Sequence, residues 1–251
     1  MLDLVICVYG CDTIVKYKKE ILKIQETWGR KAAAYESVKV LFFLGEESTD
    51  LMGDQYVHIE GVKNDYQSAS YKQFYGLKYI YENYPCKFVF CCGTDTYINI
   101  PLLLKYSTVF RHDTKLYIGG HGAETQLGEK KVYFHSGGAG FLLSHASQTA
   151  LYPLLGDIVP QWMELCAGAS AHHLLPACDV TMAYHMQRLD AFVFKQTDSV
   201  FMGCNYRGLA HGHIQCHVGA IQWNTLISCH SMSYVDFDDF TAVLEENGYY
   251  V

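Results

Sequence analysis

The sequence predicts an α/β fold, a single domain in which a central, mostly parallel but mixed sheet is flanked by helices. Apolar, β-rich runs alternate with helical stretches through the first 110 residues, which is typical of a parallel sheet covered on both faces. Beyond residue 110 strands and helices remain mixed but the segments are shorter. The 251-residue chain contains no internal repeat, low-complexity tract or linker, so we expect one domain over residues 1–251.

Three runs in the first 110 residues are expected to form buried strands, at residues 2–9, 38–44 and 88–92. A helical stretch over about residues 13–28 separates the first two runs and completes a β-α-β unit. Side chains spaced by three or four between residues 66 and 84 predict a second helix, which stops before Pro85.

Shorter segments complete the fold after residue 110. Strands are expected at residues 115–118, 131–135, 191–195 and 225–229, and helices at residues 144–155, 179–189 and 236–246. Open sheets of this kind bind ligands beyond the carboxyl ends of their strands, so side chains that follow the strands are candidates for chemistry.

Composition and charge exclude some partners. A net charge of −7 and a pI near 5.9 argue against nucleic acid, which is bound through clustered Lys and Arg. No run reaches the roughly 18 apolar residues of a membrane span, and no leader-like segment precedes the first strand, so we expect a soluble protein. Cys91 and Cys92 are adjacent in an expected core strand and no Asn-x-Ser/Thr sequon occurs, which favours the reducing cytoplasm. A luminal domain of the secretory pathway, separated from its anchor, is the alternative.

Asp95 lies where the third buried strand ends. A carboxylate in this position, followed by Thr-Tyr-Ile-Asn, could hold Mg²⁺ or Mn²⁺, which in turn binds a phosphate or diphosphate. The alternative is a loop residue that caps the helix beginning near Asn99.

A glycine cluster separates two further β-like runs. Its sequence, Ser-Gly-Gly-Ala-Gly-Phe at residues 136–141, would let the backbone approach a ligand closely, although a bulge or tight turn explains it as well. It lacks the Lys-Ser/Thr ending of a nucleotide P-loop.

Asp179 begins an expected helix. Its ordinary role there would be an N-cap, and capping would lower the pKa of its carboxyl group. If the same side chain points into a cleft, it could accept a proton from a substrate hydroxyl as a general base.

Histidines are abundant in the last third of the chain. His230 follows the expected strand at residues 225–229, and a neutral imidazole beside a carboxylate suits Mn²⁺. A zinc cluster is an alternative use of the histidines and cysteine of residues 211–217, but their spacing matches no common Cys/His module.

Several segments resemble those of a known family and appear in the family's order along the chain. They are Ile-Gln-Glu-Thr-Trp-Gly at residues 24–29, Asp65 with Tyr71-Lys72, Gly-Thr-Asp-Thr-Tyr-Ile-Asn at 93–99, Ser-Gly-Gly-Ala-Gly-Phe-Leu-Leu-Ser at 136–144, Cys-Asp-Val-Thr at 178–181 and Ser-Cys-His at 228–230. Together they resemble the fringe and core-1 β1,3-galactosyltransferase superfamily, the inverting glycosyltransferases of family 31. The glycine segment is the most specific match, and the likeness is good over about residues 2–200.

The resemblance implies a GT-A-type, Rossmann-like catalytic domain that uses Mn²⁺ or Mg²⁺ and a UDP-sugar. Residues 1–110 would form the nucleotide-sugar and metal half, and residues 111–251 the acceptor and catalytic-base half. The implied roles are the catalytic base for Asp179, metal ligation for Asp95 and His230, donor binding for Tyr9, Lys72, Gly93, Thr94 and Asp95, and a donor or acceptor pocket at Gly138, Ala139, Gly140 and Trp162. For Lys72 a surface position is the alternative, and for Trp162 burial in the core.

The expected reaction is transfer from UDP-galactose or UDP-N-acetylglucosamine to a glycan hydroxyl in β1,3 linkage. The sequence departs from the family pattern where Gly93 and Thr94 replace two acids and Cys178 replaces a third. A carbohydrate- or UDP-binding protein that has lost catalysis is therefore the alternative. A metal-dependent phosphohydrolase or nucleotidyltransferase would need several clustered acids, and only Asp95 follows that strand.

Overall fold

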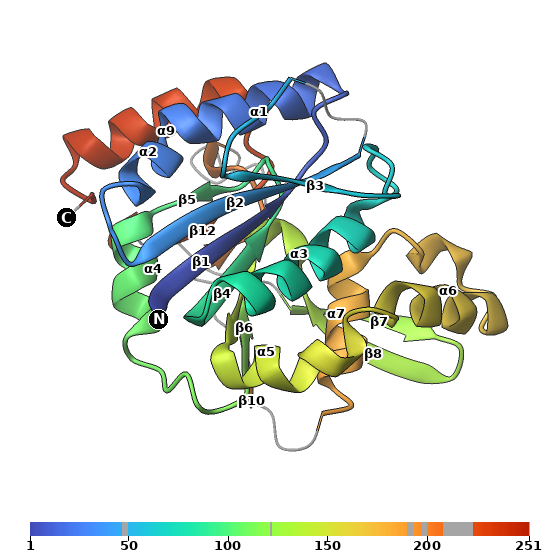
Figure 1. Cartoon of the computed structure of the whole chain (residues 1–251). Helices are drawn as coiled ribbons and strands as arrows, with labels where there is room; N and C mark the ends of the chain where they lie inside the picture. Colours follow the sequence, from blue (N-terminus) through green and yellow to red (C-terminus); the bar gives the residue numbers. More distant parts are fainter. Residues whose placement is uncertain (47–49, 121, 190–192, 197–199, 208–222, 251) are drawn as a thin grey trace.

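The structure is a computed structural model that describes residues 1–46, 50–120, 122–189, 193–196, 200–207 and 223–250 (Figure 1). A central sheet contains seven of the described strands, in the order β10 (Val193–Gln196), β6 (Leu116–Gly119), β9 (Phe141–Ser144), β4 (Cys86–Cys92), β1 (Leu2–Tyr9), β2 (Val38–Gly45) and β3 (Tyr56–Ile59). Neighbouring strands are parallel except that β9 runs antiparallel to both β4 and β6. The predicted mixed, mostly parallel sheet is confirmed.

The central strand β1 shows why its sequence is an unbroken apolar run. Leu4, Ile6 and Val8 belong to the core on one face of the sheet, whereas Val5 and Cys7 belong to the core on the other. All five side chains are fully buried. A strand with both faces buried needs no polar alternation, which is the pattern of a parallel sheet between two helical layers.

Helices cover both faces of this sheet (Figure 1). One core includes residues of α1 (Val15–Glu26), α2 (Trp28–Ala32), α4 (Ile100–Ser107) and α9 (Tyr234–Glu246), and α1 and α9 lie side by side. The other core includes residues of α3 (Ala69–Asn83), α5 (His145–Leu151), α6 (Ile158–Gly168) and α7 (Cys178–Met186). Single 3-10 turns are η1 (Gly137–Ala139), η2 (Tyr152–Leu154), η3 (His172–Leu174) and η4 (Trp223–Thr225).

Two smaller sheets complete the described strands. One is a hairpin of β7 (Gly122–Leu127) and β8 (Lys130–His135), and the other has the order β11 (Phe201–Met202), β12 (Ser228–Cys229) and β5 (Tyr97–Ile98). Strand β12 pairs antiparallel with β5 so that Cys229 lies opposite Tyr97. This register carries the residue after β12, His230, toward the residues that precede β5.

The sequence predicted most of these elements, with some differences at their ends. The expected helix at residues 13–28 is divided at Thr27, whose hydroxyl donates to the carbonyl of Lys23. The expected strand at 225–229 is shorter and comprises β12 alone. Strands β3, β5, β7 and β11 and helix α6 were not predicted, and residues 191–192 of an expected strand lie outside the described part of the chain.

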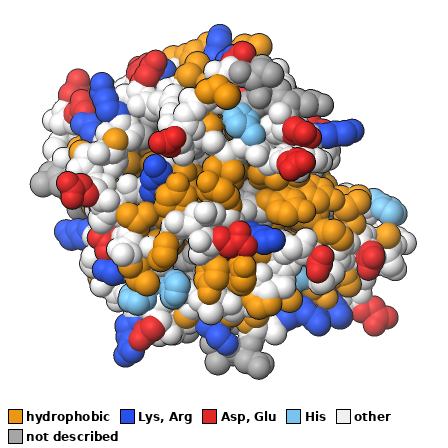
Figure 2. All heavy atoms as spheres, viewed as in Figure 1, with side chains coloured by type: hydrophobic (Ala, Val, Ile, Leu, Met, Phe, Trp, Pro, Cys, Tyr) orange, Lys and Arg blue, Asp and Glu red, His pale blue; other side chains and the backbone are white. Residues whose placement is uncertain are grey.

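The outer surface is mixed in character. On the face shown in Figure 2, Lys and Arg side chains are scattered among Asp and Glu, and hydrophobic side chains gather across the middle of that face. Among the described residues, no helix is both long and apolar enough to cross a membrane.

Candidate active site

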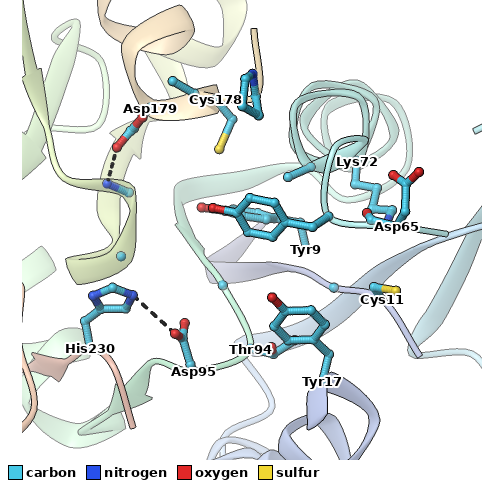
Figure 3. Close-up of a pocket in the computed structure, with 18 of the residues that line it drawn as sticks. Tyr9, Cys11, Tyr17, Asp65, Lys72, Thr94, Asp95, Cys178, Asp179 and His230 are labelled. Carbon is cyan, nitrogen blue, oxygen red and sulfur yellow. Dashed lines mark hydrogen bonds and ion pairs between the residues drawn. The ribbon is translucent and has the colours of Figure 1, made fainter. Parts of the chain in front are cut away.

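A cavity of about 410 Å³ opens at the carboxyl ends of β1 and β4, where ligands of such sheets bind (Figure 3). Both halves of the chain contribute to its wall. The lining residues are Tyr9, Gly10, Cys11, Lys16, Tyr17, Asp65, Tyr66, Ala69, Lys72, Gly93, Thr94, Asp95, Ser136, Gly137, Gly138, Pro176, Ala177, Cys178, Asp179 and His230. The cavity therefore brings Asp95, Asp179 and His230 to one place, although they are far apart in the sequence.

Asp95 and His230 form a pair at one end of the cavity (Figure 3). Nε2 of His230 lies 3.3 Å from Oδ2 of Asp95, and about a quarter of each side chain is exposed. The pairing of β12 with β5 brings the two residues together, and the backbone N–H of Met232 donates to the carbonyl of Asp95 over 3.0 Å. The other ring nitrogen of His230 lies 3.3 Å from the carbonyl oxygen of Gly203, which fixes the orientation of the ring.

The two side chains shift each other's pKa. Burial alone would raise the pKa of Asp95, but the hydrogen bond and charge of His230 bring it below its ordinary value. Burial alone would lower the pKa of His230, but the Asp95 carboxylate raises it. Each shift favours the charged form, so the pair favours an ionised carboxylate next to a protonated imidazole, and a cation bound at Nε2 would take the place of that proton.

This pair fits a divalent cation of the Mn²⁺ type, because one carboxylate oxygen and one imidazole nitrogen face the same space. In the described part of the chain no group of three or more His, Cys, Asp or Glu side chains is arranged to hold a metal. The described residues would thus supply two ligands, and the coordination positions that they leave open would suit water or oxygens of a bound ligand.

The turn at Gly137 and Gly138 lies between this pair and Asp179. A methyl group built on Gly138 would lie 2.5 Å from Nε2 of His230, and one on Gly137 would lie 3.1 Å from Cβ of Asp179. The hydroxyl of Thr96 donates to the carbonyl of Gly138 over 2.9 Å and holds the turn in place. The two glycines thus allow one functional side chain to pack on each side of the turn.

Asp179 reaches the cavity from the first turn of α7. Its Oδ2 accepts the backbone N–H of Gly137 and its Oδ1 accepts that of Val180, both over 2.9 Å. The N-cap of α7 is Ala177, so the expectation that Asp179 would be the N-cap is wrong. The expected lowering of its pKa is also wrong: burial raises the pKa of Asp179 by more than the two backbone hydrogen bonds lower it.

Tyr9 extends from the end of β1 across the cavity toward Cys178 and Asp179 (Figure 3). Its hydroxyl oxygen would lie 3.3 Å from a methyl group on Gly137, and burial raises its pKa. Burial also raises the pKa of the Cys178 thiol, to about 12, so the thiol beside Asp179 stays protonated at neutral pH.

Lys72 lines the cavity but is not a surface residue, because only 1% of it is exposed. Its ammonium group donates to the carbonyl of Asp65 over 2.8 Å and lies 3.4 Å from Oδ1 of Asn64. The alternative of a surface lysine is therefore wrong. Lys72 shapes the wall of the cavity by holding the segment before α3.

Three residues of α1 belong to this site and were not predicted. Lys16 and Tyr17 line the cavity, and the fully buried Glu20 accepts the hydroxyl of Thr94 over 2.6 Å. The Thr94 hydroxyl therefore donates its hydrogen bond to helix α1. The signal in the sequence was an acidic residue four positions before Ile24, on the apolar face of the helix.

Other predicted site residues lie elsewhere. Trp162 is fully buried in the core, and its indole N–H donates to the carbonyl of Leu174 over 3.0 Å, so its assignment to the pocket is wrong. Ala139 and Gly140 lie behind the turn and do not line the cavity: the Ala139 carbonyl accepts the Ser228 hydroxyl, and Gly140 packs on Phe90.

Two alternative roles concern the cap of helix α4 and a zinc cluster. Helix α4 is capped by Asn99, whose side chain accepts the N–H of Leu102, and not by Asp95. The residues of the alternative zinc cluster, at 211–217, lie outside the described part of the chain.

Comparisons with known proteins agree with this architecture. The family model described as Fringe-like matches residues 3–200. The crystal structure of a glycosyltransferase involved in the glycosylation of the major capsid of PBCV-1 is similar with a TM-score of 0.56 and 11% identity, over 96% of this chain and 99% of that one. That likeness shows a fold of the GT-A type.

Two crystal structures of the glycosyltransferase GlyE of Streptococcus pneumoniae TIGR4 are similar with TM-scores of 0.45 and 0.47 and identities of 9% and 11%. They match 99% of this chain, which spans 64% of the length of each. Among curated proteins, none matches the sequence.

Proposed function

Because this chain belongs to the Fringe-like family of glycosyltransferases, we propose that it transfers a sugar from a UDP-sugar to a hydroxyl group of a glycan, with inversion at the anomeric carbon. UDP-galactose and UDP-N-acetylglucosamine are the proposed donors, and a β1,3 linkage is the proposed product. One observation carries this proposal: Asp179 and the Asp95–His230 pair line one cavity, on the two sides of the Gly137–Gly138 turn.

Asp179 is the proposed general base. Each of its carboxylate oxygens accepts one backbone N–H, so each keeps a lone pair that can accept the proton of an acceptor hydroxyl. As the hydroxyl oxygen forms its bond to the anomeric carbon, its proton passes to Asp179 and the bond to the UDP oxygen breaks on the opposite face. A general base contributes about 10²- to 10⁴-fold to such a step, and a raised pKa suits Asp179 to it.

Asp95 and His230 are the residues that would hold Mn²⁺ or Mg²⁺. When bound there, the cation would supply positive charge to the diphosphate leaving group. The chain adds the ammonium group of Lys16, which lines the same cavity and carries a charge of the sign that a diphosphate needs. Tyr9 and Lys72 would form the opposite wall of the donor site.

A binding protein without transferase activity is the second candidate. The observation in its favour is that the positions before Asp95 offer no further acid: Gly93 has no side chain, and the Thr94 hydroxyl is bonded to Glu20. Such a protein would bind UDP with a divalent cation but would not turn over any donor.

Titration calorimetry with UDP, with and without Mn²⁺, followed by a hydrolysis screen over a panel of UDP-sugars, separates these candidates. A transferase binds UDP more tightly with Mn²⁺ and hydrolyses at least one donor slowly in the absence of acceptor. Binding without any turnover favours the second candidate, and no binding of UDP under either condition rejects both.

Asp179→Asn tests the base directly. We expect kcat to fall by about 10²-fold or more while the affinity for UDP stays within about twofold, because the base acts in the chemical step. Asp157→Asn, at an exposed aspartate outside the cavity, is the matched control and should leave both values unchanged. Strong residual turnover of Asp179→Asn would remove this residue from the role.

A further inference from the structure

Glu20 is a buried carboxylate with one strong partner. It lies on α1, is fully buried, and accepts the Thr94 hydroxyl at Oε2 over 2.6 Å. Its other oxygen, Oε1, has no hydrogen-bond partner among the described residues and lies 3.7 Å from the ammonium group of Lys16. Burying a carboxylate costs free energy unless its oxygens accept hydrogen bonds, so loss of the bond from Thr94 would be unfavourable.

Thr94 has little freedom to turn. It is 4% exposed, and a methyl group built on Gly10 would lie 2.8 Å from its Cγ2. The side chain is thus confined between the end of β1 and helix α1, with its hydroxyl directed to Glu20. The segment from Gly93 to Asp95 is consequently anchored to the helix by this one side chain.

Asp95 lies between two anchored threonines. Thr94 is bonded to Glu20 on α1, and Thr96 is bonded to the carbonyl of Gly138 over 2.9 Å. Gly93, which precedes them, has no side chain with which to hold the segment. The two threonine hydrogen bonds therefore help to set the direction of the Asp95 carboxylate toward His230, together with the backbone bond from Met232 to the Asp95 carbonyl.

We propose that Glu20 is a positioning residue, which acts through the Thr94 hydroxyl to hold the Asp95 carboxylate at His230 in the arrangement that binds a divalent cation. The inference rests on the proposed function, because it assigns the cation to this pair. It gives Glu20 and Thr94 a role in metal affinity without direct contact with the metal.

Electron paramagnetic resonance titration of Mn²⁺, in the presence of UDP, measures the affinity directly. Thr94→Val removes the hydroxyl at nearly constant volume, and we expect Mn²⁺ binding to weaken about 10-fold, at the lower end of the 10- to 100-fold typical of outer-shell partners of metal ligands. Thr94→Ser keeps the hydroxyl, so its Mn²⁺ affinity should stay within about threefold of that of the unaltered chain, a smaller loss than the one expected for Thr94→Val.

Glu20→Leu should weaken Mn²⁺ binding as much as Thr94→Val, and the double variant should be no weaker than either, because all three lack the same hydrogen bond. If Glu20→Leu does not fold, Glu20→Gln carries the test: its amide accepts a weaker bond, so its Mn²⁺ affinity should fall between those of the unaltered chain and Thr94→Val. Ser107→Ala, which loses a buried hydroxyl on α4 outside the cavity, is the control and should bind normally.

The kinetic signature separates positioning from general damage. In the Thr94→Val variant the Mn²⁺ concentration for half-maximal activity should rise about 10-fold while kcat at saturating Mn²⁺ changes by less than about threefold, because only metal binding is weakened. An unchanged Mn²⁺ affinity in Thr94→Val, additive losses in the double variant, or a loss in Thr94→Ser equal to that in Thr94→Val would each overturn the inference. If the unaltered chain binds UDP but no Mn²⁺, the metal role of Asp95 and His230 fails as well, whereas normal binding by every variant rejects the role of Glu20 alone.

Discussion

Gly138→Ala provides a sharp test of the metal site, because its effect can be worked from one contact. The added methyl carbon would lie 2.5 Å from Nε2 of His230 and closer still to Cε1 and Nδ1, whereas nonbonded atoms of this size are comfortable at about 3.5 Å. The φ angle of Gly138 is not positive, so alanine itself fits the backbone and the cost is steric. The imidazole ring must therefore move away by roughly 1 Å.

That movement would separate the two proposed ligands. Nε2 of His230 is 3.3 Å from Asp95, and a further shift of about 1 Å takes it beyond hydrogen-bond distance. We expect Mn²⁺ affinity to fall about 10- to 100-fold, which is about 1.4–2.7 kcal/mol at 25 °C, together with an overpacking cost of about 1–3 kcal/mol in unfolding free energy. Calorimetric titration with Mn²⁺ and urea unfolding measure the two effects separately.

Two other glycines provide the comparison. Gly168→Ala places a methyl group where no atom lies within 4 Å, so Mn²⁺ affinity should not change. Gly137→Ala approaches Cβ of Asp179 at 3.1 Å and should reduce kcat more than metal affinity. Normal Mn²⁺ binding by a folded Gly138→Ala variant would refute the assignment of His230 as a ligand.

Three further predictions concern pH and stability. Burial lowers the pKa of His185 to about 4, so between about pH 6.5 and pH 4 the unfolded chain binds a proton that the folded chain does not. The unfolding free energy should therefore fall by up to about 3 kcal/mol as the pH decreases through that window. Urea titrations of His185→Gln should no longer show this loss. Because burial raises the pKa of Asp179, kcat/KM should decline with falling pH at a value above the ordinary 3.8 of an aspartate, and a decline only below it would contradict a buried base. Trp162→Ala should lower unfolding free energy by about 3–5 kcal/mol in thermal or urea unfolding while UDP affinity per folded molecule is kept; intact stability with lost UDP binding would return Trp162 to the pocket.

Lys72 and Trp162 show where local pattern was insufficient. A lysine on a helix is usually exposed, but the turn at Asn64 and Asp65 closes over Lys72 and supplies its partners. Trp162 lies two residues after Pro160 in a segment with no clear strand or helix alternation. The packing of α6 against α3, α7 and η3 decides that its ring is internal. In both cases contacts remote in sequence determine the exposure of a side chain.

Local patterns in the chain were enough to predict the β-α-β beginning, the position of Asp95 at a strand end and the glycine turn. These features follow from local chemistry, since apolar runs buried on both faces, strand-ending residues and glycines have the same meaning wherever the chain places them. Three features could not be predicted in this way and became visible in the folded chain: His230 meets Asp95, Glu20 holds Thr94 across 74 residues, and burial outweighs hydrogen bonding at Asp179. Those facts depend on strand register and on the low dielectric of the folded interior, which no single stretch of sequence contains.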